Sequence, residues 1–129
     1  MKICIINTLY YPNIVGGAER SVQFLAEALV QKGHQAIVIS LAPQHGTRSP
    51  EHNGVRAYTI GHRLIPWPFR GGGIPWFVKP YYFALDSFYN PFTCRAAGKI
   101  VAREQPDVVH SNNIFGFSPR IWSLVKTLG

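Results

Sequence analysis

A chain of 129 residues is long enough for one domain with its own core and too short for two domains of ordinary size. Its hydrophobic content of 47% and charged content of 15% exclude a disordered chain. The net charge of +7 comes from scattered cations and not from a basic run, so we expect no nucleic-acid partner and favour an anionic membrane surface or phosphorylated ligands.

The apolar runs are too short for a signal peptide or a membrane-spanning helix. The first run, KICII, ends at Asn7 and Thr8, and no uninterrupted run reaches the roughly 18 residues that a spanning helix needs. Two distant cysteines, Cys4 and Cys94, suit a reducing compartment and form no disulfide framework or metal-ligand cluster. We therefore expect a cytoplasmic protein, with peripheral contact to the inner face of the membrane as a further option.

The first half of the chain predicts a strand, a helix and two more strands. Residues 2–7 (KICIIN) are continuously apolar, which is typical of a parallel strand covered on both faces. Apolar residues recur at helical spacing over 18–32, and Gly33 stands where a C-terminal cap belongs. Further strands are predicted at 35–42 and 55–60, with a loop between them that includes HGTRSPEHNG (45–54).

The second half predicts a helix, a strand and a last helix. The first helix covers 93–105 and ends before Pro106, because a residue that precedes proline is disfavoured in the helical conformation. A strand follows at 107–112, then a helix with Pro119 in its first turn and Gly129 as a possible cap. This order predicts an α/β fold with a doubly wound, mostly parallel, Rossmann-like sheet.

The segment 62–92 interrupts this pattern. It holds ten of the chain's seventeen aromatic residues together with several prolines, so it is too apolar for an idle linker. It either packs over one edge of the sheet, forms a pocket for an apolar acceptor, or docks on a membrane. In the membrane hypothesis the inserted side chains are Trp67, Phe69, Trp76 and Phe77, and those facing anionic headgroups are Arg63, Arg70 and Lys79.

Two loops hold the candidate functional residues. In a doubly wound sheet of strand order 3-2-1-4, ligands bind between the loops that follow the first and fourth strands, here NTLYYPNIVGGAE and HSNNIFGFSP. Gly16 and Gly17 precede a helix, whose N-terminal N–H groups and dipole attract phosphate, and glycine allows close approach. The alternatives are a plain turn at the glycines, a structural His110, and turn caps at Asn112 and Asn113.

The stretch YYPNIVGGAERSVQFLAEALVQKGHQAIVIS, followed by PDVVHSNNIFGFSP, resembles the N-terminal domain of glycosyltransferase family 4 enzymes of the GT-B fold. The layout matches over residues 2–41 and 98–128. We therefore expect residues 1–129 to form part of such a domain, ending before its later strands, with an aromatic insertion at about 62–92. The resemblance implies transfer of a sugar from a nucleotide-sugar donor to a glycan or lipid-linked acceptor, which this domain binds.

The resemblance also implies roles for individual residues. The glycine loop approaches the diphosphate of the donor, and His110 matches the first histidine of a His-x-His element that lines the sugar site, whereas Asn112 replaces the second. Neutral donors and a helix start can stabilise a leaving diphosphate, so we predict no metal and no cofactor other than the donor substrate. The predicted site comprises His110 as the catalytic residue and Gly16, Gly17, Glu19, Asn112 and Asn113 as donor-phosphate and substrate-binding residues.

We expect the 129 residues alone to be inactive, because the C-terminal domain that grips the nucleotide in such enzymes is missing. The alternative is a non-catalytic binding or membrane-recruitment module of the same fold, which Asn112 and the aromatic segment keep open. Dinucleotide-dependent oxidoreductases and P-loop hydrolases fit poorly, because the chain lacks a Gly-x-Gly-x-x-Gly loop and GGAER lacks Gly-Lys-Ser/Thr.

Overall fold

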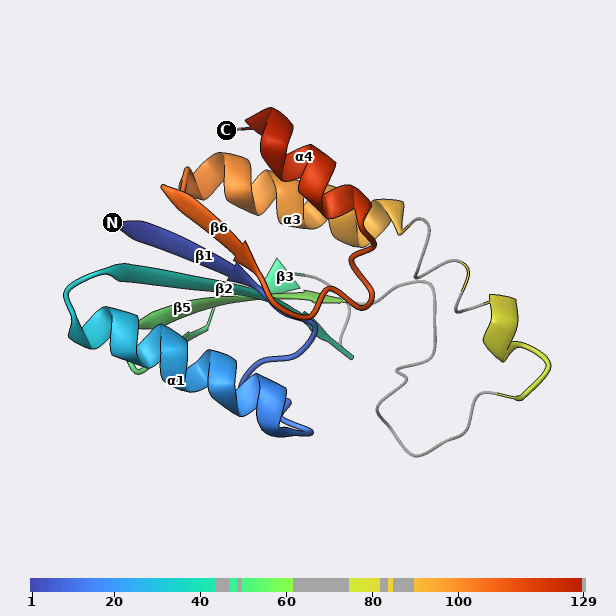
Figure 1. Cartoon of the computed structure of the whole chain (residues 1–129). Helices are drawn as coiled ribbons and strands as arrows, with labels where there is room; N and C mark the ends of the chain where they lie inside the picture. The colour runs from blue at the N-terminus through green and yellow to red at the C-terminus, as the bar shows by residue number, and fades with distance from the viewer. Residues whose placement is uncertain (44–46, 49, 62–74, 82–83, 85–89, 129) are drawn as a thin grey trace.

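The computed structural model describes residues 1–43, 47–48, 50–61, 75–81, 84 and 90–128. A central sheet is covered by α1 (Gly17–Gln31) on one face and by α3 (Pro91–Glu104) and α4 (Arg120–Leu128) on the other (Figure 1). The predictions for Trp67, Phe69, Arg63 and Arg70 fall outside the described residues, as does most of 62–92.

Four strands run parallel in the order β5–β2–β1–β6. They are β1 (Lys2–Ile6), β2 (Gln35–Ala42), β5 (Val55–Gly61) and β6 (Val108–Ser111). In the register of the sheet, Ile5 of β1 lies between Val38 of β2 and His110 of β6. The predicted α/β class, with a mostly parallel sheet of order 3-2-1-4, is therefore confirmed.

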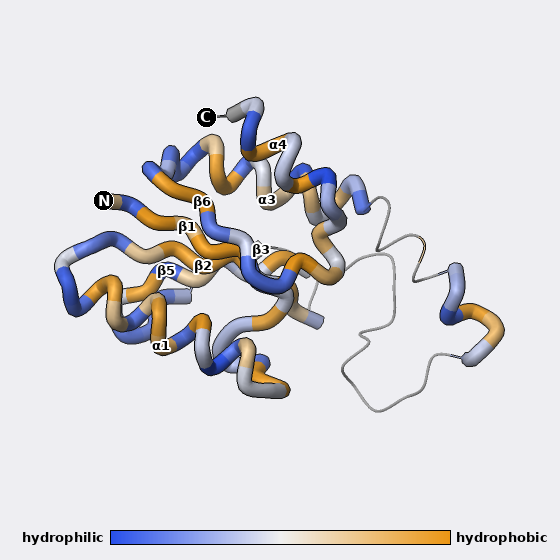
Figure 2. Tube along the Cα trace, in the orientation of Figure 1, coloured by the Kyte–Doolittle hydropathy of each residue, from blue (hydrophilic) through white to orange (hydrophobic). Residues whose placement is uncertain are grey.

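Side chains of the strands alternate between two cores, because successive residues of a strand point to opposite faces. Ile5 and Val38 pack with the α1 residues Val22 and Ala26. Figure 2 shows apolar residues concentrated along β1 and β2, between the helix layers. The core on the other face includes Cys4, Ile6, Ile37 and Ile39 of the sheet, Ile100 and Val101 of α3, and Ile121 of α4.

The helix ends largely follow the sequence signals. Gly33 has φ 85°, and its N–H donates to the Val30 carbonyl at 2.9 Å, which closes α1 as predicted. Gln105 leaves the helical conformation (φ 46°) directly before Pro106. α3 begins two residues earlier than predicted, because Asn90 caps it: the Asn90 side chain accepts the Thr93 N–H at 3.3 Å.

The prediction of a plain loop over 45–54 is wrong. Two short strands, β3 (Thr47–Arg48) and β4 (Glu51–His52), pair antiparallel with β5. β4 turns into β5 through Asn53 and Gly54, whose positive φ angles of 50° and 77° are those of a two-residue hairpin turn. A Cβ at Gly54 would lie 2.8 Å from Cγ1 of Val30, so the turn also packs closely on α1.

Candidate active site

The loops that follow β1 and β6 are joined at the carboxyl edge of the sheet. The Asn113 N–H donates to Oδ1 of Asn7 at 3.0 Å, and the Asn112 N–H donates to the Ile6 carbonyl at 3.0 Å. The Thr8 hydroxyl donates to the carbonyls of Asn113 and Phe115, at 3.1 and 2.9 Å. The two loops that the strand order predicts to border one crevice are thus neighbours held by direct hydrogen bonds.

The residues that make this junction were missed in the sequence as functional positions. Asn7 is fully buried, donates its own N–H to the Ile39 carbonyl at 3.0 Å, and donates from Nδ2 to the Leu9 carbonyl at 2.7 Å. Thr8 is buried as well. Two polar residues directly after a buried strand were the available signal, because buried polar groups must find partners.

α3 holds the loop after β6 from the other side. The Thr93 hydroxyl donates to the Gly116 carbonyl at 2.7 Å, and the Cys94 thiol donates to the Phe117 carbonyl at 2.5 Å. Burial raises the pKa of the Cys94 thiol, so the group stays protonated and keeps this role. Burial, followed by the Glu104 charge, also raises the pKa of Cys4 to about 12, and neither cysteine is in a disulfide.

The glycine pair lies at the start of α1. Gly16 is in extended conformation, and its N–H donates to Oε2 of Glu19 at 2.7 Å. Glu19 is buried, so its carboxylate holds the loop at the helix start instead of facing outward. A Cβ added at Gly17 would meet nothing within 4 Å. Nothing in the described part of the chain therefore requires glycine at position 17.

His110 lies on the same face of the sheet as α1. It pairs in register with Ile5, whose side chain belongs to the core under α1, and the imidazole is exposed on the outermost parallel strand. α1 starts at this carboxyl edge, because it follows the loop after β1. His110 and the pair Gly16–Gly17 therefore share one face at one end of the sheet.

The two asparagines after His110 differ in their environment. Oδ1 of Asn113 accepts the Phe115 N–H at 3.1 Å, so this side chain caps the turn, as the alternative interpretation expects. Asn112 is exposed, and its backbone carries the bond to β1. Of the predicted polar side chains, Glu19 and Asn113 thus have partners inside the chain, while His110 and Asn112 face outward.

The loop after β1 is also fixed near its middle. Tyr10 is buried under α1, and burial, followed by the Glu27 charge, raises its pKa to about 12. The next residue, Tyr11, stacks on His52 of β4 with ring centroids 3.9 Å apart. This contact brings β4 against the segment that leads to the glycines, although the sequence assigned His52 nothing.

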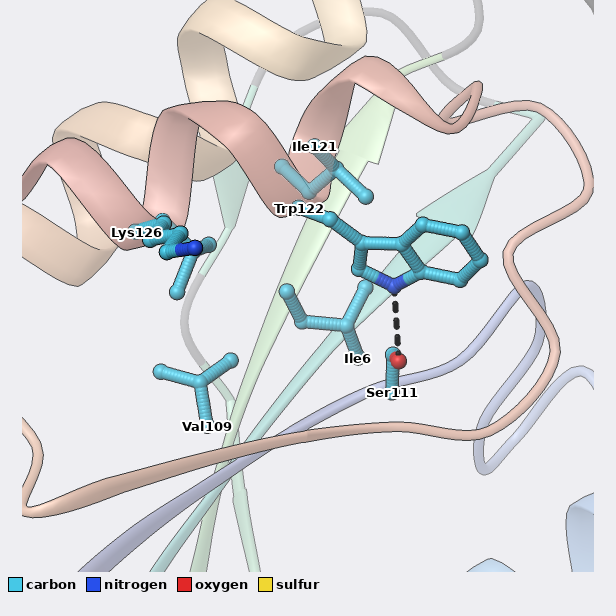
Figure 3. Close-up of a pocket in the computed structure, with 7 residues that line it drawn as sticks. Ile6, Val109, Ser111, Ile121, Trp122 and Lys126 are labelled. Carbon is cyan, nitrogen blue, oxygen red and sulfur yellow. Dashed lines mark hydrogen bonds between the residues drawn. The ribbon is translucent and has the colours of Figure 1, made fainter.

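A cavity of about 160 Å³ lies on the opposite face, between β6 and α4 (Figure 3). The Trp122 indole N–H donates to the Ser111 hydroxyl at 2.9 Å across it. Because Val109 and Ser111 point away from the face that carries His110, the cavity is separate from the predicted crevice. Its lining residues are Ile6, Val109, Ser111, Ile121, Trp122, Val125 and Lys126.

The described part of the aromatic segment is exposed. Trp76 is 81% exposed and Phe77 69%, so neither side chain packs in the core, and Lys79 is exposed as well. Within the described ranges, no three His, Cys, Asp or Glu side chains are grouped to hold a metal ion. No helix described here has the length and hydropathy to cross a membrane.

An open parallel sheet with helices on both faces, and with paired loops at the point where the strand order reverses, defines a Rossmann-like α/β domain. The family model of Glycosyltransferase Family 4 matches residues 15–129. The chain belongs to this family, which confirms the resemblance found in the sequence and gives the chain a general role in glycosyl transfer.

Similar proteins agree with this family. The chain is 36% identical over 126 residues to a 42.6 kDa protein in the cps region of Klebsiella pneumoniae, covering 98% of this chain and 34% of that protein. It is 28% identical over 121 residues to a subunit of human phosphatidylinositol N-acetylglucosaminyltransferase, covering 88% and 20%. A Mycobacterium tuberculosis glycogen synthase is 35% identical over 65 residues, covering 50% and 16%. The chain spans about a third or less of these relatives.

Proposed function

We propose that this chain is the acceptor-side part of a hexosyltransferase-like enzyme that moves a sugar from a nucleotide-sugar donor to an acceptor. The observation that carries the proposal is the junction of the two loops, in which Asn113 donates to Asn7 at 3.0 Å. This junction keeps the start of α1 and the end of β6 together. Family membership supports the reaction class.

In this proposal the free N–H groups at the start of α1 face the diphosphate of the donor, and Gly17 leaves room for its approach. His110 and Asn112 line the sugar from the end of β6, where both are exposed. Hydrogen-bond donors at these positions stabilise the charge that develops on the leaving diphosphate. Glu19 holds the loop through Gly16. The proposal includes no metal and no cofactor, because the donor enters as a substrate.

The acceptor that we propose is a glycan or a lipid-linked molecule. Among the relatives, one is named for phosphatidylinositol and another for glycogen, so both acceptor types occur among similar proteins. We propose a role in polysaccharide biosynthesis, and a further domain outside these 129 residues that grips the nucleotide. The chain by itself is then inactive.

The experiment screens a panel of nucleotide sugars for transfer or hydrolysis. It uses a longer reading frame that contains these residues, beside its Gly17→Val and His110→Ala variants. We expect each variant to lose about 100-fold or more in kcat/KM, because each disturbs stabilisation of the leaving group. Unchanged thermal unfolding of Gly17→Val would show that the loss is not structural, since no neighbour contacts a side chain there.

His34→Ala is the matched control for His110→Ala, because His34 follows the far end of α1. Its activity should be unchanged. Full activity of Gly17→Val and His110→Ala would contradict the proposed site, and turnover by the 129 residues alone would contradict the proposed need for a further domain.

The second candidate is a non-catalytic module that docks on an anionic membrane through residues 62–92. The exposure of Trp76 and Phe77 favours it, because exposed aromatic side chains next to a cation suit a membrane interface. A folded, longer protein that is inactive with every donor, yet sediments with anionic vesicles until Trp76 and Phe77 are replaced by Ser, would select this function.

A further inference from the structure

Helix α1 is apolar on both sides. Val22 and Ala26 on its inner side are buried in the core, at 2% and 0% exposed. On its outer side Phe24 is 63% exposed and Leu25 44% exposed. A helix that is apolar all round is normally covered on both sides. The outer side of α1 therefore has the character of a contact surface, although the fold covers only the inner one (Figure 1).

The apolar surface continues past the start of the helix. Val15, the residue before the glycine pair, is 67% exposed. We call this surface the α1 outer face and define it by Val15, Arg20, Phe24, Leu25 and Lys32. It extends from the proposed donor-phosphate loop along the length of the helix.

The charges on the α1 outer face are all positive. Arg20 and Lys32 are exposed on either side of Phe24 and Leu25. Both acidic residues of α1 are turned away from solvent. Glu19 is buried, and Glu27 is half-buried and accepts hydrogen bonds from Gln23 and Asn53, each at 2.9 Å. The exposed part of α1 thus combines large apolar side chains with cations and with no acidic group.

We infer that the α1 outer face docks on an anionic lipid surface. Such a helix lies in the plane of the interface, with Phe24 and Leu25 among the acyl chains and with Arg20 and Lys32 at the anionic headgroups. Charge complementarity selects this occupant, because the whole chain carries a net charge of +7. Docking in this way places Gly16 and Gly17 at the membrane surface. The inference does not depend on sugar transfer and uses residues outside 62–92.

The test is sedimentation of the 129-residue chain with phosphatidylcholine vesicles, with and without 30 mol% (about a third) phosphatidylglycerol. We expect binding to the anionic vesicles, and about a tenfold or greater loss of binding in the double variant Phe24→Gln, Leu25→Gln. The variant Arg20→Gln, Lys32→Gln should lose about fivefold per cation and with it the preference for anionic lipid.

The matched control is Phe92→Gln, because Phe92 is 50% exposed and belongs to α3, on the opposite face of the sheet. Its binding should equal that of the unchanged chain. Circular dichroism checks that each variant is folded, and the charge variant decides alone if Phe24→Gln, Leu25→Gln does not fold. Three results would overturn the inference: no binding to anionic vesicles, equal loss in the control, or binding that persists in both α1 variants.

A second pair of measurements separates other occupants of this face. Binding that is lost in Trp76→Ser, Phe77→Ser but kept in both α1 variants would assign the membrane contact to the aromatic segment and overturn the inference. A dimer in analytical ultracentrifugation that disappears in Phe24→Gln, Leu25→Gln, without any vesicle binding, would assign the face to a second copy of the chain and overturn it too.

Discussion

Asn7 occupies the point at which the two halves of the proposed crevice are joined. Its side chain accepts the Asn113 N–H and donates to the Leu9 carbonyl, and the residue is fully buried. Removal of the amide leaves two backbone groups without their partners in a site that the chain shields from water. The cost of such groups exceeds the net gain of an ordinary hydrogen bond.

Asn7→Ala should therefore lower the free energy of unfolding by about 1–3 kcal/mol. Urea denaturation followed by circular dichroism measures the change. Asn112→Ala is the matched control, since the Asn112 side chain is exposed and only its backbone bonds to β1. We expect a change within about 0.5 kcal/mol for this control. Equal losses in the two variants would contradict a special role for Asn7.

Glu104 connects α3 to the opposite end of the sheet. Its carboxylate accepts hydrogen bonds from the Tyr58 hydroxyl at 2.5 Å and from Arg56 at 3.1 Å, and Nζ of Lys2 lies 3.6 Å away. Burial by itself would raise the pKa of Glu104, but the bond from Tyr58 and the charge of Arg56 outweigh it, so that the pKa lies below its usual value of 4.5.

The lowered pKa predicts a pH dependence of stability. A carboxyl group whose pKa falls on folding stabilises the folded state above its unfolded pKa, and this contribution disappears as the pH falls through the folded pKa. The free energy of unfolding should thus decrease below about pH 5, and Glu104→Gln should remove about 1 kcal/mol at pH 7 and flatten this decrease. Urea unfolding from pH 3 to 7 (roughly the range that spans both pKa values) tests this. The same slope in Glu104→Gln as in the unchanged chain would contradict it.

At this scale the sequence located positions better than contacts. Gly16, Gly17 and His110 were assigned to one end of the sheet because strand ends can be read from apolar runs. The partners of Glu19 and Asn113 could not be assigned, because they depend on how the loops fold onto each other. The role of Asn7 depends on residues 106 positions away in the chain.

Elements with a continuous apolar pattern were the most predictable. β2 has the predicted bounds, and β1, β5 and β6 differ from prediction by one residue at an end, because strands buried on both faces carry an uninterrupted signal. The start of α3 was missed because its cap, Asn90, lies within a proline- and aromatic-rich stretch whose pattern hides the helix signal. The hairpin from β4 to β5 had a signal in Asn53-Gly54, which a loop interpretation passed over.

The hairpin turn makes a prediction of its own. Gly54 combines a φ of 77° with a site where a Cβ would lie 2.8 Å from Val30. Gly54→Ala should destabilise the chain by about 1–3 kcal/mol, as measured by urea unfolding, because the left-handed conformation and the close contact both disfavour a side chain. Gly17→Ala is the control, and its free energy of unfolding should not fall. A stable Gly54→Ala would show that the turn relaxes without cost.

At the scale of the whole molecule, the sheet ends at β6. In the described residues β6 pairs with β1 alone, and the cavity beside Trp122 lies next to it. An unpaired strand edge can accept a strand from another chain. The topology that places β6 there was predictable from the order of elements, whereas the cavity depends on how α4 packs and was not.

We expect the 129-residue chain to self-associate as its concentration rises. Val108→Lys should reduce this association, because Val108 is 43% exposed on β6 and a charged edge disfavours strand pairing. Analytical ultracentrifugation measures it, with Thr127→Lys on α4 as a control that adds the same charge away from the strand edge. Equal effects of the two lysines would attribute the association to net charge instead of strand pairing.

The central place of β1 has a consequence for synthesis on the ribosome. β1 is the first strand to be made, and β2 can pair with it early, but its other neighbour begins only at Val108. At translation rates of about 5–20 residues per second, that side of β1 stays open for roughly 5–20 s while the aromatic segment emerges. A nascent chain arrested before residue 108 should therefore be cleaved by added protease within β1 and β2, and one released after Leu128 should resist cleavage there.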